Sequence, residues 1–146
     1  MTQTLSPADM ICYAIYAANH ALTRTYRALL DPLGLTYPQY LVLTVLWSAP
    51  EPLPVKALGA QLRLDSGTLT PLVKRLEGAG LVARARNPKD ERETLVSLTA
   101  AGQALQAQAA HVPEAILEAT GMPMAELADL RDRITALRAR LDAETD

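Results

Sequence analysis

One stretch, VKALGAQLRLDSGTLTPLVKRLEGAGL at residues 55–81, constrains the fold of this chain more than any other. Apolar residues at helical spacing predict a short helix, and RLD predicts a turn after it. Asp65 or Ser66 can cap a second helix, and Gly78 and Gly80 indicate where that helix ends. Two short helices joined by a tight turn are typical of a helix-turn-helix. The predicted buried side of the second helix consists of Leu69, Leu72, Val73 and Leu76.

A predicted β-hairpin follows this helix pair. Residues 81–86 and residues 94–98 alternate between apolar and polar side chains, as strands do, around the turn-prone sequence NPKDE. A hairpin directly after the second helix makes the unit a winged helix-turn-helix, which is a nucleic-acid-binding device. The sequence therefore predicts a mainly α fold with a small β-hairpin wing.

The N-terminal region predicts one long helix. Ser6 can act as its N-cap, Pro7 suits the first helical position, and Asp9 suits the third. The helical pattern continues to about Leu30. On this assignment Cys12 lies in the second helical turn, where the helix dipole gives little help, because its effect fades within the first turn.

Further helical patterns flank the winged unit. One covers residues 38–47, and another begins after Thr99, runs past Ala110 and is interrupted near Pro113. A last helix has an apolar stripe with spacings of three and four over about two heptads, and such a stripe needs a partner surface. The stripe consists of Leu127, Leu130, Ile134, Leu137 and Leu141.

Length and charge fit a single DNA-binding domain. The chain has 146 residues and a net charge of −2, and this length suits one domain with a real core. Residues 56–92 carry a net charge of +4, which leaves −6 for the remainder. A basic middle between acidic ends is expected when one face meets a polyanion. The first ten residues lack the features of a signal peptide, and apolar runs fall short of the about 20 residues that span a bilayer, so we expect a cytoplasmic protein.

The predicted DNA contacts lie on the second helix of the pair and on the hairpin. Small hydroxyl groups near the start of the helix can approach base edges and phosphates, and long basic side chains can reach phosphates. An arginine at the wing tip can enter a minor groove. Asp90 and Glu91 do not suit phosphate contact, and we expect them to orient neighbouring arginines. The predicted contacts are Ser66, Thr68, Thr70, Lys74, Arg75, Arg84, Arg86 and Arg92.

The residues alone leave the role of the single cysteine, Cys12, open. A cysteine is commonly a small buried hydrophobe. A reactive cysteine needs a stabilised thiolate, and cations on the same helix are too distant, which leaves tyrosine hydroxyls as donors. The two histidines are far apart, and we find neither a phosphate-binding loop nor a nucleophile elbow. We therefore expect no catalytic site, metal site or cofactor.

Three strings together resemble the multiple-antibiotic-resistance regulator (MarR) family. They are LTYPQYLVLTVLW at residues 35–47, LDSGTLTPLVKRLEGAGLV at residues 64–82 and DERE at residues 90–93. MICYAIYAAN at residues 10–19 is similar to the cysteine segment of the family's organic-hydroperoxide-responsive branch. The resemblance, over roughly residues 9–141, implies a transcriptional repressor of the oxidative stress response. It implies that an organic hydroperoxide oxidises one cysteine to sulfenic acid and that the protein then releases its operator.

The resemblance also implies a homodimer that binds palindromic double-stranded DNA. Its N- and C-terminal helices would intertwine, which accounts for the apolar stripe of the last helix. Within a single chain domain 1–146, residues 7–34 and 100–146 would then form the helical dimerisation region. Residues 35–99 would form the winged helix-turn-helix lobe. Two lobes related by a two-fold axis match two half-sites of a palindrome.

The resemblance assigns sensor residues one by one. Cys12 corresponds to the peroxide-sensing cysteine, and Tyr26 and Tyr37 correspond to tyrosines that hydrogen-bond this cysteine from the partner subunit. Tyr16 corresponds to a further tyrosine near the site. Tyr26 lies 14 residues beyond Cys12, about 21 Å along one helix, so it can reach Cys12 only across a dimer.

Two other features of the family concern the wing and the fate of the cysteine. Arg92 corresponds to the wing arginine and Asp90 to its acidic partner. Some members carry a second, resolving cysteine, and its absence here excludes an intersubunit disulfide between a sensing and a resolving cysteine. Cys12 would remain a sulfenic acid, become overoxidised, or be capped by a low-molecular-weight thiol.

Two alternatives stay open at this point. In the first, the protein is a MarR-type repressor that a small aromatic acid releases from DNA, and Cys12 serves only in packing. In the second, the protein is an enzyme, a one-cysteine thiol peroxidase. The winged helix has no purpose under the second reading.

Overall fold

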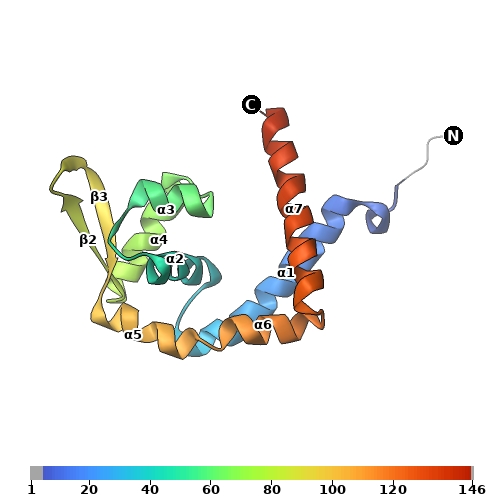
Figure 1. Ribbon diagram of the computed structural model, residues 1–146, viewed down its shortest axis with the longest axis horizontal. Helices are drawn as coiled ribbons and strands as arrows, with labels where there is room; N and C mark the ends of the chain where they lie inside the picture. The colour runs from blue at the N-terminus through green and yellow to red at the C-terminus, as the bar shows by residue number, and fades with distance from the viewer. Residues whose placement is uncertain (1–4, 146) are drawn as a thin grey trace. The chain divides into compact units, whose positions relative to one another are not determined.

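The computed structural model describes residues 5–145 and has two compact units, Met1–Ala110 and His111–Asp146. The first unit holds helices α1 (Ile11–Leu30), α2 (Tyr37–Ser48), α3 (Val55–Leu62), α4 (Ser66–Gly78) and α5 (Ala100–Ala109) (Figure 1). It also holds strands β1 (Leu53–Pro54), β2 (Val82–Asn87) and β3 (Asp90–Leu98), and the short 3-10 helices η1 (Pro7–Asp9) and η2 (Asp31–Leu33). The second unit holds α6 (Val112–Thr120) and α7 (Met124–Thr145).

The predicted winged helix-turn-helix is confirmed. Helices α3 and α4 are joined by a turn in which Arg63 has a left-handed backbone, with φ of 54°. Asp65 caps α4, because its Oδ1 accepts a hydrogen bond of 2.7 Å from the N–H of Thr68. The buried residues of α4 are the four predicted ones, Leu69, Leu72, Val73 and Leu76.

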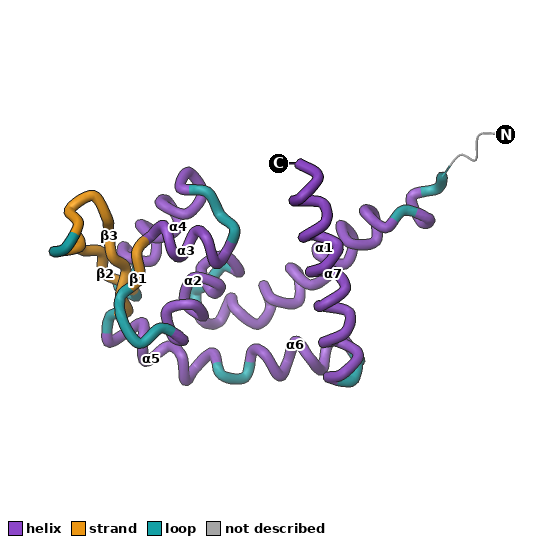
Figure 2. Tube along the Cα trace, turned by 45° about the horizontal axis from the view of Figure 1, so that its top comes forward, coloured by secondary structure: helices purple, strands orange, loops and turns teal. Residues whose placement is uncertain are grey.

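The wing is a three-stranded antiparallel sheet in the order β1-β3-β2, drawn in orange in Figure 2. Prediction from sequence missed β1, in which Leu53 pairs with Val96. Because β1 has two residues and one is a proline at the sheet edge, it lacks the alternation that marks a strand. Strand β3 begins at Asp90 rather than near Thr94, so DERE lies in the strand and not in the turn.

The predicted start of the first helix is wrong, and the error concerns Cys12 directly. Residues 7–9 form the separate 3-10 helix η1, and the backbone is extended at Met10, with φ of −98° and ψ of 123°. Helix α1 begins at Ile11, so Cys12 is its second residue and lies in the first turn. A proline and a nearby acid suit the start of a 3-10 helix as well as that of an α-helix, so the sequence signal could not separate the two.

Other helix ends differ slightly from prediction. Helix α2 begins at Tyr37, and Thr36 and Gln39 cap it reciprocally in a capping box. Thr99 caps α5 as expected, but α5 ends at Ala109 instead of running past Ala110. The predicted interruption near Pro113 is confirmed, since the chain turns there and Pro113 lies in the first turn of α6.

Helix α5 is fixed to the winged lobe at Gly102. The indole Nε1 of Trp47 in α2 donates a hydrogen bond of 2.9 Å to the carbonyl oxygen of Gly102. A Cβ at this glycine would collide with the carbonyl oxygen of Leu81, so only glycine allows α5 to come this close to the wing. Within residues 5–145, we find no helix with the length and apolar character needed to cross a membrane.

Candidate functional site

The predicted DNA-contacting residues of α4 lie on its outer side. Ser66, Thr68, Lys74 and Arg75 are exposed, and Thr70 is half-buried where α4 approaches the wing. The cap by Asp65 leaves the hydroxyl groups of the first turn at the surface. This face offers hydroxyl donors at the start of the helix and two cations further along, a combination that suits contact with base edges and phosphates. Their contact with DNA stays a prediction.

The structure brings Asp90 and Arg92 together, as the sequence predicted. The Oδ1 atom of Asp90 accepts hydrogen bonds from the backbone N–H of Arg92 at 3.1 Å and from its Nε at 3.3 Å. The Arg92 side chain is 93% exposed. A fixed base with a freely exposed guanidinium is what an arginine that inserts into a groove requires.

Arg84 is placed differently from the other predicted contacts. Its Nη2 donates to Oε1 of Glu77 at 3.0 Å, and its backbone N–H donates to Oε2 of the same carboxylate at 3.2 Å. The hydrogen bond from the Arg84 side chain holds the pKa of Glu77 below its usual value. Arg84 is therefore engaged inside the lobe, where it ties β2 to α4. Prediction from sequence missed the role of Glu77, because its contact with Arg84 forms only when the wing folds back onto α4.

Arg86 and its neighbours stabilise the hairpin. The Nη1 of Arg86 donates to the backbone oxygen of Glu91 at 2.7 Å. Across the turn, the Nδ2 of Asn87 donates to Oε2 of Glu93 at 2.8 Å. The Oδ1 of Asn87 accepts from the N–H of Lys89 at 3.0 Å. These bonds hold the wing in one conformation, so that its exposed arginines are presented from a fixed base.

The predicted sensor tyrosines Tyr26 and Tyr37 lie together at the junction of α1 and α2. Their ring centroids are 4.5 Å apart, and Tyr40 lies 6.0 Å from Tyr26. Burial, with smaller electrostatic effects of Tyr37 and Tyr40, raises the pKa of Tyr26 to about 12. Burial also raises the pKa of Tyr37. Both phenols are therefore neutral hydrogen-bond donors at physiological pH.

Cys12 lies apart from this tyrosine pair within one chain. Its thiol is free and exposed, and α1 continues without a break from Ile11 to Leu30, so about 21 Å of helix separates Cys12 from Tyr26. Tyr16 is one turn from Cys12, and its ring packs edge-on against His20 at 4.4 Å. Cys12 is the second residue of α1 and so lies in the first turn, where the positive end of the helix dipole acts.

Over residues 5–145, the structure shows no group of three or more histidine, cysteine or acidic side chains that could hold a metal ion.

Comparison with known proteins agrees with this geometry. A family model for the transcriptional regulators SarA/Rot matches residues 24–108. The HTH-type transcriptional regulator TtmR of Methylorubrum extorquens is 49% identical over 135 residues, which is 92% of this chain and 69% of TtmR. The organic hydroperoxide resistance transcriptional regulator of Bacillus subtilis is 43% identical over 129 residues, which is 88% of this chain and 87% of that protein.

Solved structures of AbfR, a protein of Staphylococcus epidermidis, are also similar. Reduced AbfR bound to DNA has a TM-score of 0.80 and 33% identity, with 95% of this chain and 94% of that chain covered. Overoxidized AbfR bound to DNA has a TM-score of 0.74 and 34% identity, with coverages of 90% and 93%. The similarity extends across the winged helix-turn-helix and the helices on either side of it.

Proposed function

Because the chain belongs to the SarA/Rot family of MarR-like winged-helix transcriptional regulators, we propose that it is a repressor that releases its operator when an organic hydroperoxide oxidises Cys12. The observation that carries this proposal is the exposed thiol of Cys12 in the first turn of α1. The 43% identity to an organic hydroperoxide resistance regulator and the redox states named for AbfR support it.

The chemistry needs one thiolate and one hydroperoxide. The sulfur of Cys12 attacks the terminal oxygen of the hydroperoxide, and the O–O bond breaks. The sulfur is oxidised to a sulfenic acid, and the alkoxide leaves and takes up a proton to become an alcohol. The exposed sulfur of Cys12 admits the peroxide.

The release of DNA follows from a change at the interface between two subunits. In a dimer, the Tyr26 and Tyr37 hydroxyls of one subunit would hydrogen-bond Cys12 of the other. Both hydroxyls are protonated at physiological pH, as tyrosines ordinarily are, so they can donate hydrogen bonds to a thiolate, and these bonds change when the sulfur gains an oxygen. Oxidation then favours a second dimer geometry in which the two winged lobes no longer fit adjacent half-sites.

The proposal requires a homodimer, and α7 supplies a suitable surface. Leu130, Ile134 and Leu141 follow one stripe of α7 and are all exposed in the single chain. A stripe of this kind is buried when two copies pair. Two-fold symmetry would then match a palindromic operator. The protein would act in the cytoplasm, where a low-molecular-weight thiol can condense with the sulfenic acid and hold the oxidised state as a mixed disulfide.

A gel-shift experiment on the DNA upstream of the protein's own gene tests this function. Wild-type protein should bind the DNA, release it on addition of cumene hydroperoxide, and rebind after reduction by a dithiol. Cys12→Ser should bind with similar affinity and stay bound. Release of Cys12→Ser at the wild-type peroxide concentration would rule out sensing by this cysteine. Consumption of one peroxide per subunit, without sustained turnover when thiol is added, would separate a sensor from a thiol peroxidase.

A further inference from the structure

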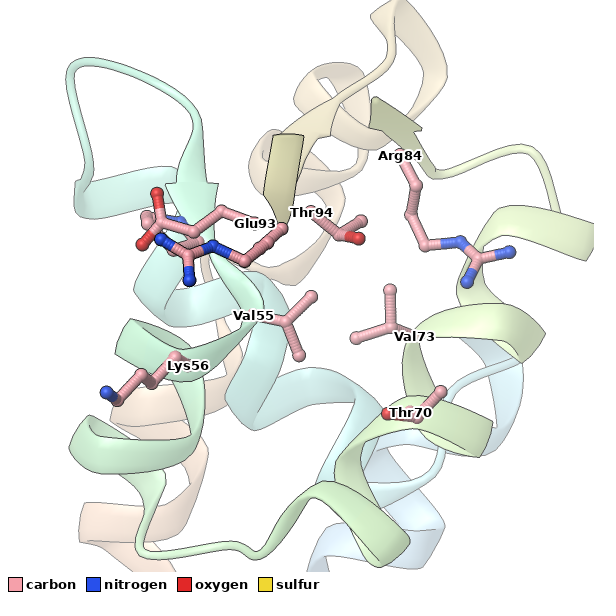
Figure 3. Close-up of a pocket in the computed structure, with 9 residues that line it drawn as sticks. Val55, Lys56, Thr70, Val73, Arg84, Glu93 and Thr94 are labelled. Atoms are coloured by element: carbon pink, nitrogen blue, oxygen red, sulfur yellow. The ribbon is translucent and has the colours of Figure 1, made fainter. Parts of the chain in front are cut away.

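A cavity of about 200 Å³ lies in the winged lobe between α3, α4 and β3. Figure 3 shows Val55 and Val73 facing one another across this cavity, with Lys56 on the side of Val55 and Thr70 on the side of Val73. Val73 is buried, so the cavity offers one apolar side chain, Val55, with a hydroxyl group on one side and a cation on the other. Such a combination matches a sugar–phosphate chain, in which apolar sugar faces alternate with anionic phosphates.

Two charged side chains of β3 also line this cavity. Arg92 adds a second cation, which is 93% exposed and held at its base by Asp90. Glu93 adds a carboxylate, but this group accepts a hydrogen bond from Asn87 on the hairpin. Lys56 is exposed, and within residues 5–145 no acid lies at ion-pair distance from its ammonium group. The two cations are therefore available to an anion from outside the chain.

The position of the cavity identifies the anion. On the proposed function, α4 enters a major groove and the wing reaches the adjacent minor groove. One sugar–phosphate chain of the duplex separates these two grooves and must pass between the two elements. The cavity lies where α4 and β3 come together, since Thr70 and Val73 belong to α4 and Arg92 belongs to β3.

We propose that this cavity seats one sugar–phosphate segment of the operator strand that separates the two grooves. The deoxyribose packs on Val55, and the adjacent phosphates bind Lys56 on one side and Thr70 on the other, while Arg92 continues past this strand into the minor groove. Lys56 is the residue that this assignment adds to the DNA interface, and it acts through the DNA backbone irrespective of base sequence. The inference rests on the proposed DNA-binding function.

The test measures how the affinity of the full-length protein for DNA depends on salt. Loss of one phosphate contact per half-site should lower the slope of log affinity against log salt concentration by about 0.9 per contact, hence by about two for a dimer. Lys56→Ala should therefore lower this slope and weaken binding on the order of tenfold at low salt. The same factor should apply to operator DNA and to an unrelated duplex. Lys56→Arg should restore both quantities, because it keeps the cation.

Matched variants separate this contact from a general charge effect. Arg24→Ala removes the same charge from the exposed side of α1, outside the cavity, and should leave the slope unchanged. Glu93→Gln keeps the hydrogen bond from Asn87 but removes a negative charge beside the phosphates, so binding should tighten about two- to fivefold. Ethylation of the phosphate between the two grooves should block wild-type binding and should matter much less to Lys56→Ala.

The outcomes are distinct. A lower slope for Lys56→Ala, uniform across sequences and accompanied by loss of ethylation interference at that phosphate, supports the proposal. A slope equal to that of Arg24→Ala, or a loss confined to operator sequence, overturns it while leaving the regulator function intact. Failure of the wild-type protein to bind DNA would overturn the proposed function and, with it, this inference.

Discussion

The carboxylate of Glu77, in the last turn of α4, accepts two hydrogen bonds from Arg84, the third residue of β2. One comes from the backbone N–H and the other from the guanidinium, so the carboxylate fixes both the strand and the side chain. The predicted recognition helix and the wing are thereby joined by a charge-assisted contact close to the base of the hairpin. Their relative position decides whether Arg92 can reach a minor groove while α4 occupies the major groove.

Glu77→Ala is expected to weaken operator binding through the wing. In the wild-type background, Arg92→Ala should cost about tenfold in affinity, which is about 1.4 kcal/mol. In the Glu77→Ala background the same change should cost less than about twofold, because a displaced wing no longer delivers the arginine. A double-mutant cycle by fluorescence anisotropy measures this difference. Equal costs of Arg92→Ala in both backgrounds would show that the Glu77–Arg84 contact does not position the wing.

The same pair predicts a pH dependence of stability. The hydrogen bond and positive charge of Arg84 lower the pKa of Glu77 in the folded protein. The contribution of ionised Glu77 to the stability of the fold is therefore complete above the ordinary pKa of a glutamate, about 4.3. This contribution is lost as the pH falls through the lowered pKa of Glu77. Urea unfolding of the wild-type protein and of Glu77→Gln, compared between neutral and acidic pH, isolates this contribution. The stability difference between the two should shrink on acidification, and a constant difference would contradict the assignment.

The raised pKa of Tyr26 predicts that the protein loses stability at high pH, whereas the Glu77–Arg84 pair predicts a loss at low pH. Burial raises the pKa of Tyr26 to about 12, whereas a tyrosine in the unfolded chain has a pKa of about 10. The folded state holds the proton more tightly, so stability is lost as the pH rises from about 10 through about 12. Titration of tyrosinate absorbance should show a final step that Tyr26→Phe removes. Tyr37→Phe should move that step to lower pH, because Tyr37 contributes to the raised pKa of Tyr26.

Gly102→Ala should destabilise the contact between α5 and the wing. A Cβ at this position would collide with the carbonyl oxygen of Leu81 and lie 3.2 Å from Cδ2 of Leu98. We expect a cost of about 1–3 kcal/mol or more in the free energy of unfolding. Trp47 reports on the site by fluorescence, since its indole bonds the Gly102 carbonyl. Gly78→Ala is the control, because within residues 5–145 no atom lies within 4 Å of the position of a Cβ at Gly78. This substitution should leave the free energy of unfolding nearly unchanged or increase it.

Periodicity and turn chemistry predict the winged lobe well because its signals are local. The apolar face of α4 follows from its spacing, and the cap at Asp65 follows from residue type. The start of α1 could not be predicted in this way, since Pro7 and Asp9 fit η1 equally well. The consequence is chemical, because the break at Met10 moves Cys12 from a predicted second turn into the first turn of α1.

Contacts between distant segments explain what prediction from sequence missed. Glu77 and Arg84 are seven residues apart, but their contact exists only after β2 has folded back along α4. The strand β1 is too short to show a pattern before it pairs with β3. Similarly, spacing along α1 separates Cys12 from Tyr26, and only the resemblance to a family of dimers suggested that the two meet.

Ile134→Asp should prevent the pairing of two copies of the chain. Ile134 is 43% exposed at the middle of the apolar stripe of α7, between Leu130 and Leu141. A carboxylate there would have to be buried without a partner in a dimer, which costs several kcal/mol. Light scattering should therefore report a monomer, and binding to a palindromic operator should be lost. Ala136→Asp places the same charge two residues along, on the opposite side of the helix, and should leave a dimer. A dimer mass for both variants would mean that this stripe is not the dimer interface.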